Sequence, residues 1–230
     1  MYAMKLVTLS DSHTKHLELK IPEGDIIIHG GDALSYGDAV EFQNFIEWYD
    51  GRPFQTRVYV PGNHDWAVYN NQESCREILK KHGITLLVDE EITIDGVRIW
   101  GTPWTTEFCG WAYMRQDHEA ESVDGEEGLG KYFDLIPDGI DVLVSHGPPY
   151  GFLDAAPSAP HVGSQELLKA IMRVKPKLVL VGHIHEGRKQ GDGEGNDYIY
   201  HDDGKVTHIA NISVLDGRYR QVHKVRTFEV

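Results

Sequence analysis

Short apolar runs recur along this chain, and each is bounded by turn-forming or polar residues. Runs of this length that are rich in β-branched residues are typical of buried strands. The pattern predicts five such strands, at Met4–Leu9, Asp25–His29, Arg57–Val60, Asp141–Ser145 and Leu178–Val181.

Apolar residues at helical spacing lie between these runs. In Asp38–Tyr49 the apolar side chains fall on one side of a helix, and Ser164 is a suitable N-cap for a second helix over Gln165–Val174. Pro176 ends that second helix because proline cannot continue a helical hydrogen-bond ladder. Cys75 and Leu79 share a helical face as well, so we expect Cys75 to be a buried thiol without redox chemistry.

Hairpins are predicted in the middle and at the end of the chain. Asp95-Gly96 suits the positive φ angles of a tight turn between Ile92–Ile94 and Val97–Trp100. A two-residue period predicts half-buried strands further on, at Tyr198–His201, Val206–Ile212 and Tyr219–Val230. Strands and helices in this order predict an α/β fold with two packed sheets and helices outside.

Composition sets the size and the surroundings of the molecule. The chain has 230 residues and 40% hydrophobic residues, which suffices for one large layered domain over residues 1–230. No run of about 18 apolar residues occurs, so we expect no membrane span. Met1–Lys5 leads into a strand without the features of a leader peptide, and we therefore expect a cytoplasmic protein.

Charge narrows the range of partners. The formal net charge is −14, and the basic residues are scattered along the chain rather than clustered. General nucleic-acid or anionic-membrane binding depends on clustered Lys and Arg, so neither is expected here. A small phosphorylated substrate remains compatible with a locally positive site. The Gly191–Gly195 stretch is predicted to be a surface loop.

Polar side chains follow each of the five predicted buried strands. They are Asp11-Ser12-His13, Gly30-Gly31-Asp32, Gly62-Asn63-His64-Asp65, Ser145-His146-Gly147 and Gly182-His183-Ile184-His185. In open α/β sheets, binding sites gather beyond the carboxyl ends of the strands. Carboxylate and amide oxygens combined with imidazole nitrogens suit Mn, Fe, Zn or Ni. Asp32 is the natural candidate to bridge two cations, because one carboxylate has two ligand oxygens.

These motifs resemble those of calcineurin-like metallophosphoesterases, and the resemblance covers almost the whole chain. Four further stretches are similar to the metallophosphoesterase-domain-containing (MPPED) branch of this family, which is related to class III cyclic-nucleotide phosphodiesterases. These stretches are Gly101-Thr102-Pro103-Trp104, Ser145-His146-Gly147-Pro148-Pro149, Gly182-His183-Ile184-His185-Glu186-Gly187 and Asn211-Ile212-Ser213. The resemblance implies a four-layer sandwich of two mixed β-sheets flanked by helices.

The resemblance also implies a role for each residue of these motifs. The first cation would be held by Asp11, His13, Asp32 and His185, and the second by Asp32, Asn63, His146 and His183. Manganese is the favoured metal. A hydroxide between the cations would attack phosphorus, while His64 would face the phosphate as a catalytic residue whose ring Asp65 orients.

Other candidates lie outside these motifs. His161, on a Pro-rich loop, is a weaker candidate for substrate binding beside Asn63 and His64. His29 is either a partner that orients a metal ligand or a structural residue. Loop aromatics such as Trp104, Phe108, Trp111 and Tyr150 are typical of packing, although one or two could stack on a nucleobase.

Three functions compete. A phosphodiesterase acting on small diesters such as cyclic nucleotides is favoured. A phosphomonoesterase, either a nucleotidase or a phosphoprotein phosphatase, is the alternative; phosphoprotein phosphatases of this superfamily carry Asp-Arg-Gly soon after the second motif, whereas Asp32 here is followed by Ala33-Leu34-Ser35-Tyr36-Gly37. A non-catalytic scaffold would be expected to lose ligands or the His64 equivalent, and this chain retains them.

Overall fold

A computed structural model of the chain describes residues 3–118, 127–189, 197–202 and 204–230. Its first sheet has five strands, in the order β13 (Arg226–Glu229), β1 (Lys5–Leu9), β2 (Ile26–His29), β3 (Thr56–Tyr59) and β4 (Ile84–Leu86). The strands β1 to β4 are parallel, and β13 pairs antiparallel at the edge. All carboxyl ends of the parallel strands therefore meet at one edge of the sheet.

The second sheet has six strands. Their order is β11 (Tyr198–Asp202), β12 (Lys205–Asn211), β10 (Leu178–Val181), β9 (Val142–Ser145), β6 (Val97–Thr102) and β5 (Glu90–Ile94). The four inner strands are parallel, and both edge strands pair antiparallel. A two-stranded ribbon of β7 (Thr105–Thr106) and β8 (Met114–Arg115) lies apart from the two sheets.

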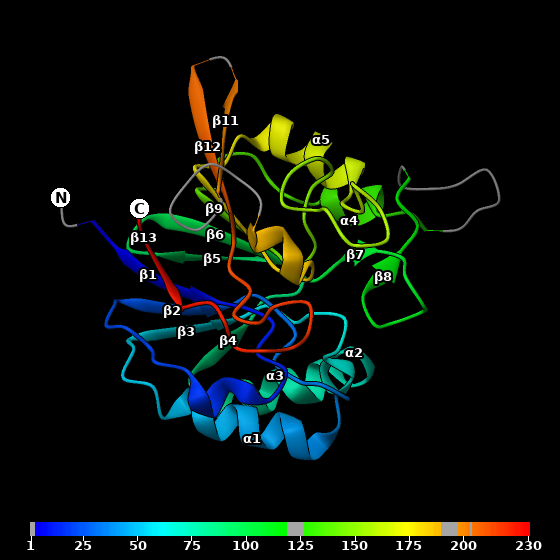
Figure 1. Cartoon of the computed structure of the whole chain (residues 1–230). Coiled ribbons are helices and arrows are strands. Elements are labelled where there is room, and N and C mark those ends of the chain that lie inside the picture. Colours follow the sequence, from blue (N-terminus) through cyan, green and yellow to red (C-terminus); the bar gives the residue numbers. More distant parts are fainter. Residues whose placement is uncertain (1–2, 119–126, 190–196, 203) are drawn as a thin grey trace.

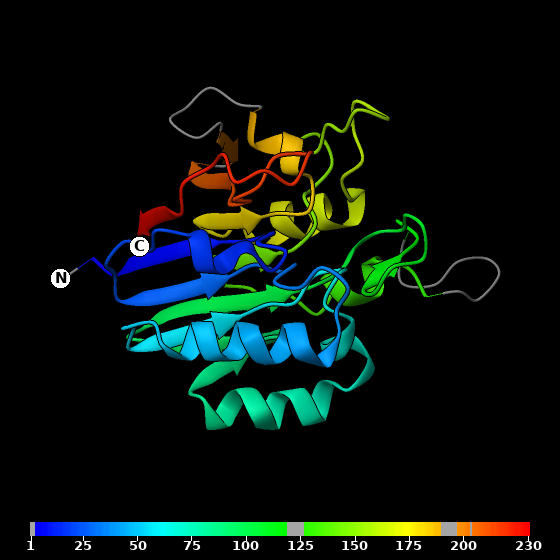
Figure 2. The ribbon, with the colours of Figure 1, turned by 60° about the horizontal axis from the view of Figure 1, so that its bottom comes forward.

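The two sheets share one apolar layer, and helices cover their outer faces (Figure 1). Leu6 and Ile28 of the first sheet belong to the same buried cluster as Val144 and Leu180 of the second. The helices α1 (Ala39–Asp50) and α3 (Gln72–Lys81) cover the first sheet, and the short α2 (Trp66–Asn70) lies between them in sequence. The helices α4 (Gly130–Phe133) and α5 (Gln165–Val174) cover the second sheet. Figure 2 shows these layers from a second direction. The predicted four-layer α/β sandwich is confirmed.

Local sequence features place the helices where they were predicted. The Asp38 carboxylate accepts the N–H groups of Val40 and Glu41 at the start of α1, and the Ser164 hydroxyl accepts the N–H of Leu167 in α5. Short 3₁₀ turns η1 (Lys15–Glu18) and η2 (His185–Lys189) complete the helical elements of the described residues. Cys75 is buried on α3, as predicted.

The predicted strands agree with the structure except near the C-terminus. The five buried strands are confirmed to within one residue at each end, and Asp95 and Gly96 both have positive φ in the hairpin turn. The prediction of one strand over Tyr219–Val230 is wrong, because only β13 is extended there. The carboxylate of Asp216 accepts the N–H groups of Arg218 and Arg220, which folds the preceding segment into a turn.

Two further observations concern the remaining expectations. The predicted surface loop at Gly191–Gly195 lies outside the described residues. In the part of the chain that the structure describes, every helix is too short or too polar to cross a bilayer.

Candidate metal centre

The strand-end residues of both sheets converge on one place. Three groups of side chains bring potential ligand atoms within 4.8 Å of one another: Asp11 with His13 and His185, His13 with Asp32 and His64, and Asp32 with His146 and His183. The oxygen of Asn63 lies 3.0 Å from the Nε2 atom of His146 and so joins the third group. All seven side chains predicted as metal ligands are therefore together.

Asp32 lies at the centre of this arrangement. One carboxylate oxygen is 3.7 Å from Nε2 of His13, and the other is 3.4 Å from Nε2 of His146. A separate pair is formed by Asp11 and His185, whose closest atoms are 3.3 Å apart. The carboxylate of Asp32 thus faces both halves of the cluster, as a bridging ligand would.

The donor set fits divalent cations. Six of the seven side chains are at most 7% exposed, namely Asp11, His13, Asp32, Asn63, His146 and His185. Neither ring nitrogen of His13 has a hydrogen-bond partner among the described residues, although both are buried. A buried polar atom without a partner is costly, and a cation would satisfy it. Mixed oxygen and imidazole donors suit a transition-metal ion better than calcium.

Backbone strain is concentrated at the same residues. Asp11, His13, Asp32 and His183 have φ angles of 54°, 40°, 54° and 61°, in the left-handed region that side chains rarely adopt. Such strain persists only where the surrounding structure enforces it, and it gathers at functional sites. Here the carboxylate of Asp11 accepts the N–H of His183 at 2.9 Å, which ties the first sheet to the second.

Glycines let the backbone approach the side chains of the cluster. A Cβ atom on Gly31 would lie 2.3 Å from Nδ1 of His146, and one on Gly182 would lie 2.4 Å from the carboxylate of Asp11. Gly31 also has a φ of +106°. Glycine is therefore required at these positions by space as well as, for Gly31, by conformation.

Gly31→Ala is expected to lower the free energy of unfolding and to weaken metal binding. Its new methyl group would displace the His146 ring, and overpacking of this kind costs about 1–3 kcal/mol. Gly96→Ala is the matched control, because Gly96 also has positive φ but a Cβ there meets nothing within 4 Å. Denaturant unfolding in a chelator measures the free energy of unfolding of both variants, and titration with Mn²⁺ measures their metal binding. Equal losses in the two variants would mean that the contact with His146 is unimportant.

Burial and charge set the protonation of the histidines. Burial lowers the pKa of His13 to about 4, and burial together with the charge of His146 lowers the pKa of His183 to about 3. Both rings are therefore neutral near pH 7 and keep a free lone pair. Burial also disfavours the charged form of His146, but the carboxylate of Asp32 outweighs it and raises the pKa of His146 to about 9.

Backbone carbonyls orient three imidazoles of the site. The Nδ1 atoms of His64, His146 and His185 lie 2.6, 3.1 and 3.1 Å from the carbonyl oxygens of Ser35, Gly30 and Asp216. A carbonyl can only accept, so each Nδ1 is the protonated nitrogen of its ring. Each Nε2 is left to face the cluster, and for His146 and His185 this is the usual way a metal-binding histidine is held.

His64 lies beside the cluster rather than deep within it. Its ring centroid is 4.6 Å from that of His13 and 4.2 Å from that of Trp111, and the side chain is half-buried. The expected role of Asp65 in orienting this ring is wrong. The buried Asp65 carboxylate instead accepts the N–H groups of Asp32, Leu34 and Gly62 and so shapes the loops that carry the ligands.

The remaining candidates have distinct places. His161 is outside the three groups, and its Nδ1 atom is 3.0 Å from a carboxylate oxygen of Asp154. The Nε2 atom of His29 lies 3.0 Å from the hydroxyl of Ser12, which stands in the sequence between the predicted ligands Asp11 and His13. Sequence reasoning missed Tyr219, whose ring lies 4.8 Å from His13 and 5.3 Å from His185. No motif marks Tyr219, because its position depends on the turn at Asp216.

Comparison with known proteins gives consistent matches. A family model described as calcineurin-like phosphoesterase matches residues 4–187. The human metallophosphoesterase domain-containing protein 1 is 31% identical over 244 residues, covering 95% of this chain and 68% of that protein. The Caenorhabditis elegans UPF0046 protein C25E10.12 is 32% identical over 203 residues, covering 80% of this chain and 69% of that protein. Among solved structures, the Thermus thermophilus protein TT1561 shares the fold with a TM-score of 0.52 at 15% identity, covering 99% of each chain.

Proposed function

Because this chain belongs to the calcineurin-like phosphoesterase family, we propose that it is a metal-dependent phosphodiesterase that hydrolyses small diesters such as cyclic nucleotides. One observation carries the proposal: carboxylate, amide and imidazole ligands from both sheets converge around Asp32, with His64 at their edge. A metal-dependent phosphoesterase needs such a cluster, with a polar group beside it for the leaving oxygen.

Two groups of residues would hold the cations. Asp11, His13 and His185 form the first and Asn63, His146 and His183 the second, with Asp32 shared between them. When bound, two divalent cations supply Lewis-acid polarisation of a phosphoryl oxygen and make water a better nucleophile near neutral pH. Manganese is our favoured metal for this donor set, which Fe, Zn or Ni would also suit.

The chain's own residues supply proton transfer and charge stabilisation. The carbonyl of Ser35 accepts from Nδ1 of His64 and so leaves Nε2 facing the cluster, where the imidazolium form of the ring would give its Nε2 proton to the leaving oxygen. Trp111 packs against the His64 ring and restricts its rotation. His64 therefore reaches the phosphate in a fixed orientation, as a general acid must.

The engagement of two arginines elsewhere in the fold favours a diester over a monoester. A dianionic monoester gains more from an arginine clamp than a monoanionic diester does. Two arginines that could have formed such a clamp, Arg115 and Arg188, are engaged elsewhere. Arg115 lies over the Trp104 ring at 5.0 Å, and the buried Arg188 donates to the carbonyls of Ser213 and Lys224.

We expect methyl p-nitrophenyl phosphate to be a better substrate than p-nitrophenyl phosphate. Both release the same leaving group and differ by one methyl ester, which removes one charge from the phosphoryl group. The kcat/KM for the diester should be higher by about tenfold or more, since one lost charge-assisted hydrogen bond is worth roughly 1.5–3 kcal/mol to the monoester. Steady-state kinetics at identical metal loading measures the ratio. A preference for the monoester would overturn the diesterase proposal and favour the phosphomonoesterase alternative.

A further inference from the structure

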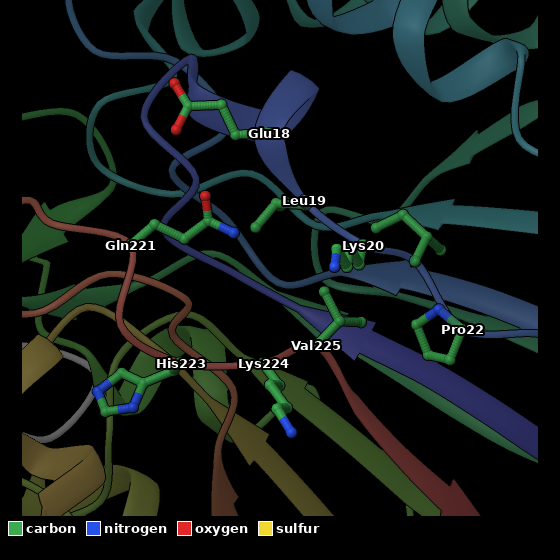
Figure 3. Close-up of a pocket in the computed structure, with 9 residues that line it drawn as sticks. Glu18, Leu19, Lys20, Pro22, Gln221, His223, Lys224 and Val225 are labelled. Carbon is green, nitrogen blue, oxygen red and sulfur yellow. The ribbon is translucent and has the colours of Figure 1, made fainter.

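A cavity of about 420 Å³ adjoins the candidate metal centre. It is lined by Thr106, Glu107, Phe108, Ala156, Ser158, Val162, His183 and Ile184. His183 belongs to both the cavity and the predicted ligand set, so a molecule bound at the metal centre can extend into this space. The cavity in Figure 3 differs in this respect, since it is lined by residues 18–22, 221 and 223–225 and includes none of the predicted ligands.

The walls of the cavity are held by hydrogen bonds that join separate loops. The hydroxyl of Thr106 donates to the carbonyl of Val162 at 2.8 Å and links the loop around β7 to the Pro-rich loop. The buried carboxylate of Asp154 accepts the N–H groups of Gly151 and Gly163, at the two ends of that second loop. The space is therefore formed before any ligand arrives, as is usual for binding pockets.

The lining is mostly apolar and contains one large exposed aromatic. Phe108 lines the cavity and is 65% exposed. An apolar group placed in the cavity would remove part of this ring from water, which is favourable. Ala156, Val162 and Ile184 supply further apolar surface on the opposite loops.

The charge of the lining restricts what can bind. Of the eight described residues around the cavity, Glu107 is the only acid and none is Lys or Arg. An anionic group would be repelled by Glu107, and no Lys or Arg in the lining would offset that repulsion. The cavity consequently suits a neutral apolar or aromatic group rather than a second phosphate.

We propose that this cavity binds the neutral apolar ester group that stays on phosphorus when a diester is hydrolysed. This inference rests on the proposed diesterase function. We expect His64 to face the leaving oxygen, and neither His64 nor its neighbour Trp111 lines the cavity. We therefore assign the cavity to the ester group that stays on phosphorus rather than to the leaving group. Phe108 is then a specificity-determining residue.

A substrate series with a constant leaving group tests the proposal. The series consists of p-nitrophenyl phosphodiesters whose second group is methyl, butyl or phenyl, each assayed with the manganese-loaded enzyme. The kcat/KM ratio of the phenyl to the methyl ester should fall by about tenfold in Phe108→Ala, since apolar groups in such pockets change discrimination by about 10–200-fold. Comparing ratios between enzymes cancels the intrinsic reactivity of the esters.

Two further variants make the result decisive. Ser158→Trp should fill the cavity and lower the same ratio, whereas Leu135→Ala, which removes a 55% exposed side chain outside the cavity, should leave it unchanged. If the enzyme hydrolyses the methyl ester well and neither Phe108→Ala nor Ser158→Trp changes the phenyl-to-methyl ratio, the inference about the cavity is overturned and the proposed function stands. Failure to hydrolyse any diester of the series would overturn the proposed function instead.

Discussion

The His64→Ala variant should lose about 10²–10⁴-fold in kcat for a diester substrate, the usual contribution of a general acid–base group, and keep both cations. The ring reaches the edge of the cluster but is fixed from outside it, by the carbonyl of Ser35 and by Trp111. Removing it takes away the proton donor to the leaving oxygen without removing a ligand. Steady-state kinetics and elemental analysis of the same preparation measure the two effects.

His82→Ala is the matched control for this experiment. His82 is a partly exposed histidine paired with Asp50 at 2.9 Å, on elements away from the predicted ligands. It should retain normal turnover. If His64→Ala binds fewer cations than the parent protein, His64 is a ligand and its assigned role is wrong.

Asp32→Asn should abolish turnover, with a loss of at least about 10³-fold, because it weakens both metal groups at once. The neutral amide keeps the shape of the side chain but removes the charge that faces His13 and His146 at 3.7 and 3.4 Å. Cations at such sites supply several kcal/mol of transition-state stabilisation. Titration of the metal-free variant with Mn²⁺ should show weaker binding in both sites.

Asp50→Asn provides the same change of side chain at an aspartate–histidine pair elsewhere. The Asp50 carboxylate is 44% exposed and contacts His82, so its loss should leave metal content and turnover unchanged. An Asp32→Asn protein that still binds two cations with parental affinity would contradict the bridging role.

The strands were predictable because burial on both faces leaves an unmistakable local pattern. Leu178–Val181 is confirmed residue for residue, since its apolar run ends at Gly182. The β4 strand was missed, because a three-residue strand directly after a helix carries too little pattern. The wrong strand at Tyr219 has a different cause: alternation favoured extension, whereas the Asp216 carboxylate folds the backbone there.

The convergence of the predicted ligands was predictable for a topological reason. Parallel strands place their carboxyl ends at one edge, so residues as distant in sequence as Asp11 and His183 come into contact. The hydrogen bonds that hold these side chains follow from loop conformation, which no residue pattern encodes. The Asp65 carboxylate therefore accepts N–H groups of the loops. The carbonyl of Ser35 orients the His64 ring, which is the role that was expected of Asp65.

Reconstitution of the metal-stripped protein tests the central claim most directly. Turnover of methyl p-nitrophenyl phosphate should be absent in chelator and should rise with added Mn²⁺ until two equivalents per chain are bound. This result follows from two groups of ligands that share Asp32. Undiminished turnover in the metal-free protein, or full turnover at one bound equivalent, would contradict a dinuclear phosphodiesterase.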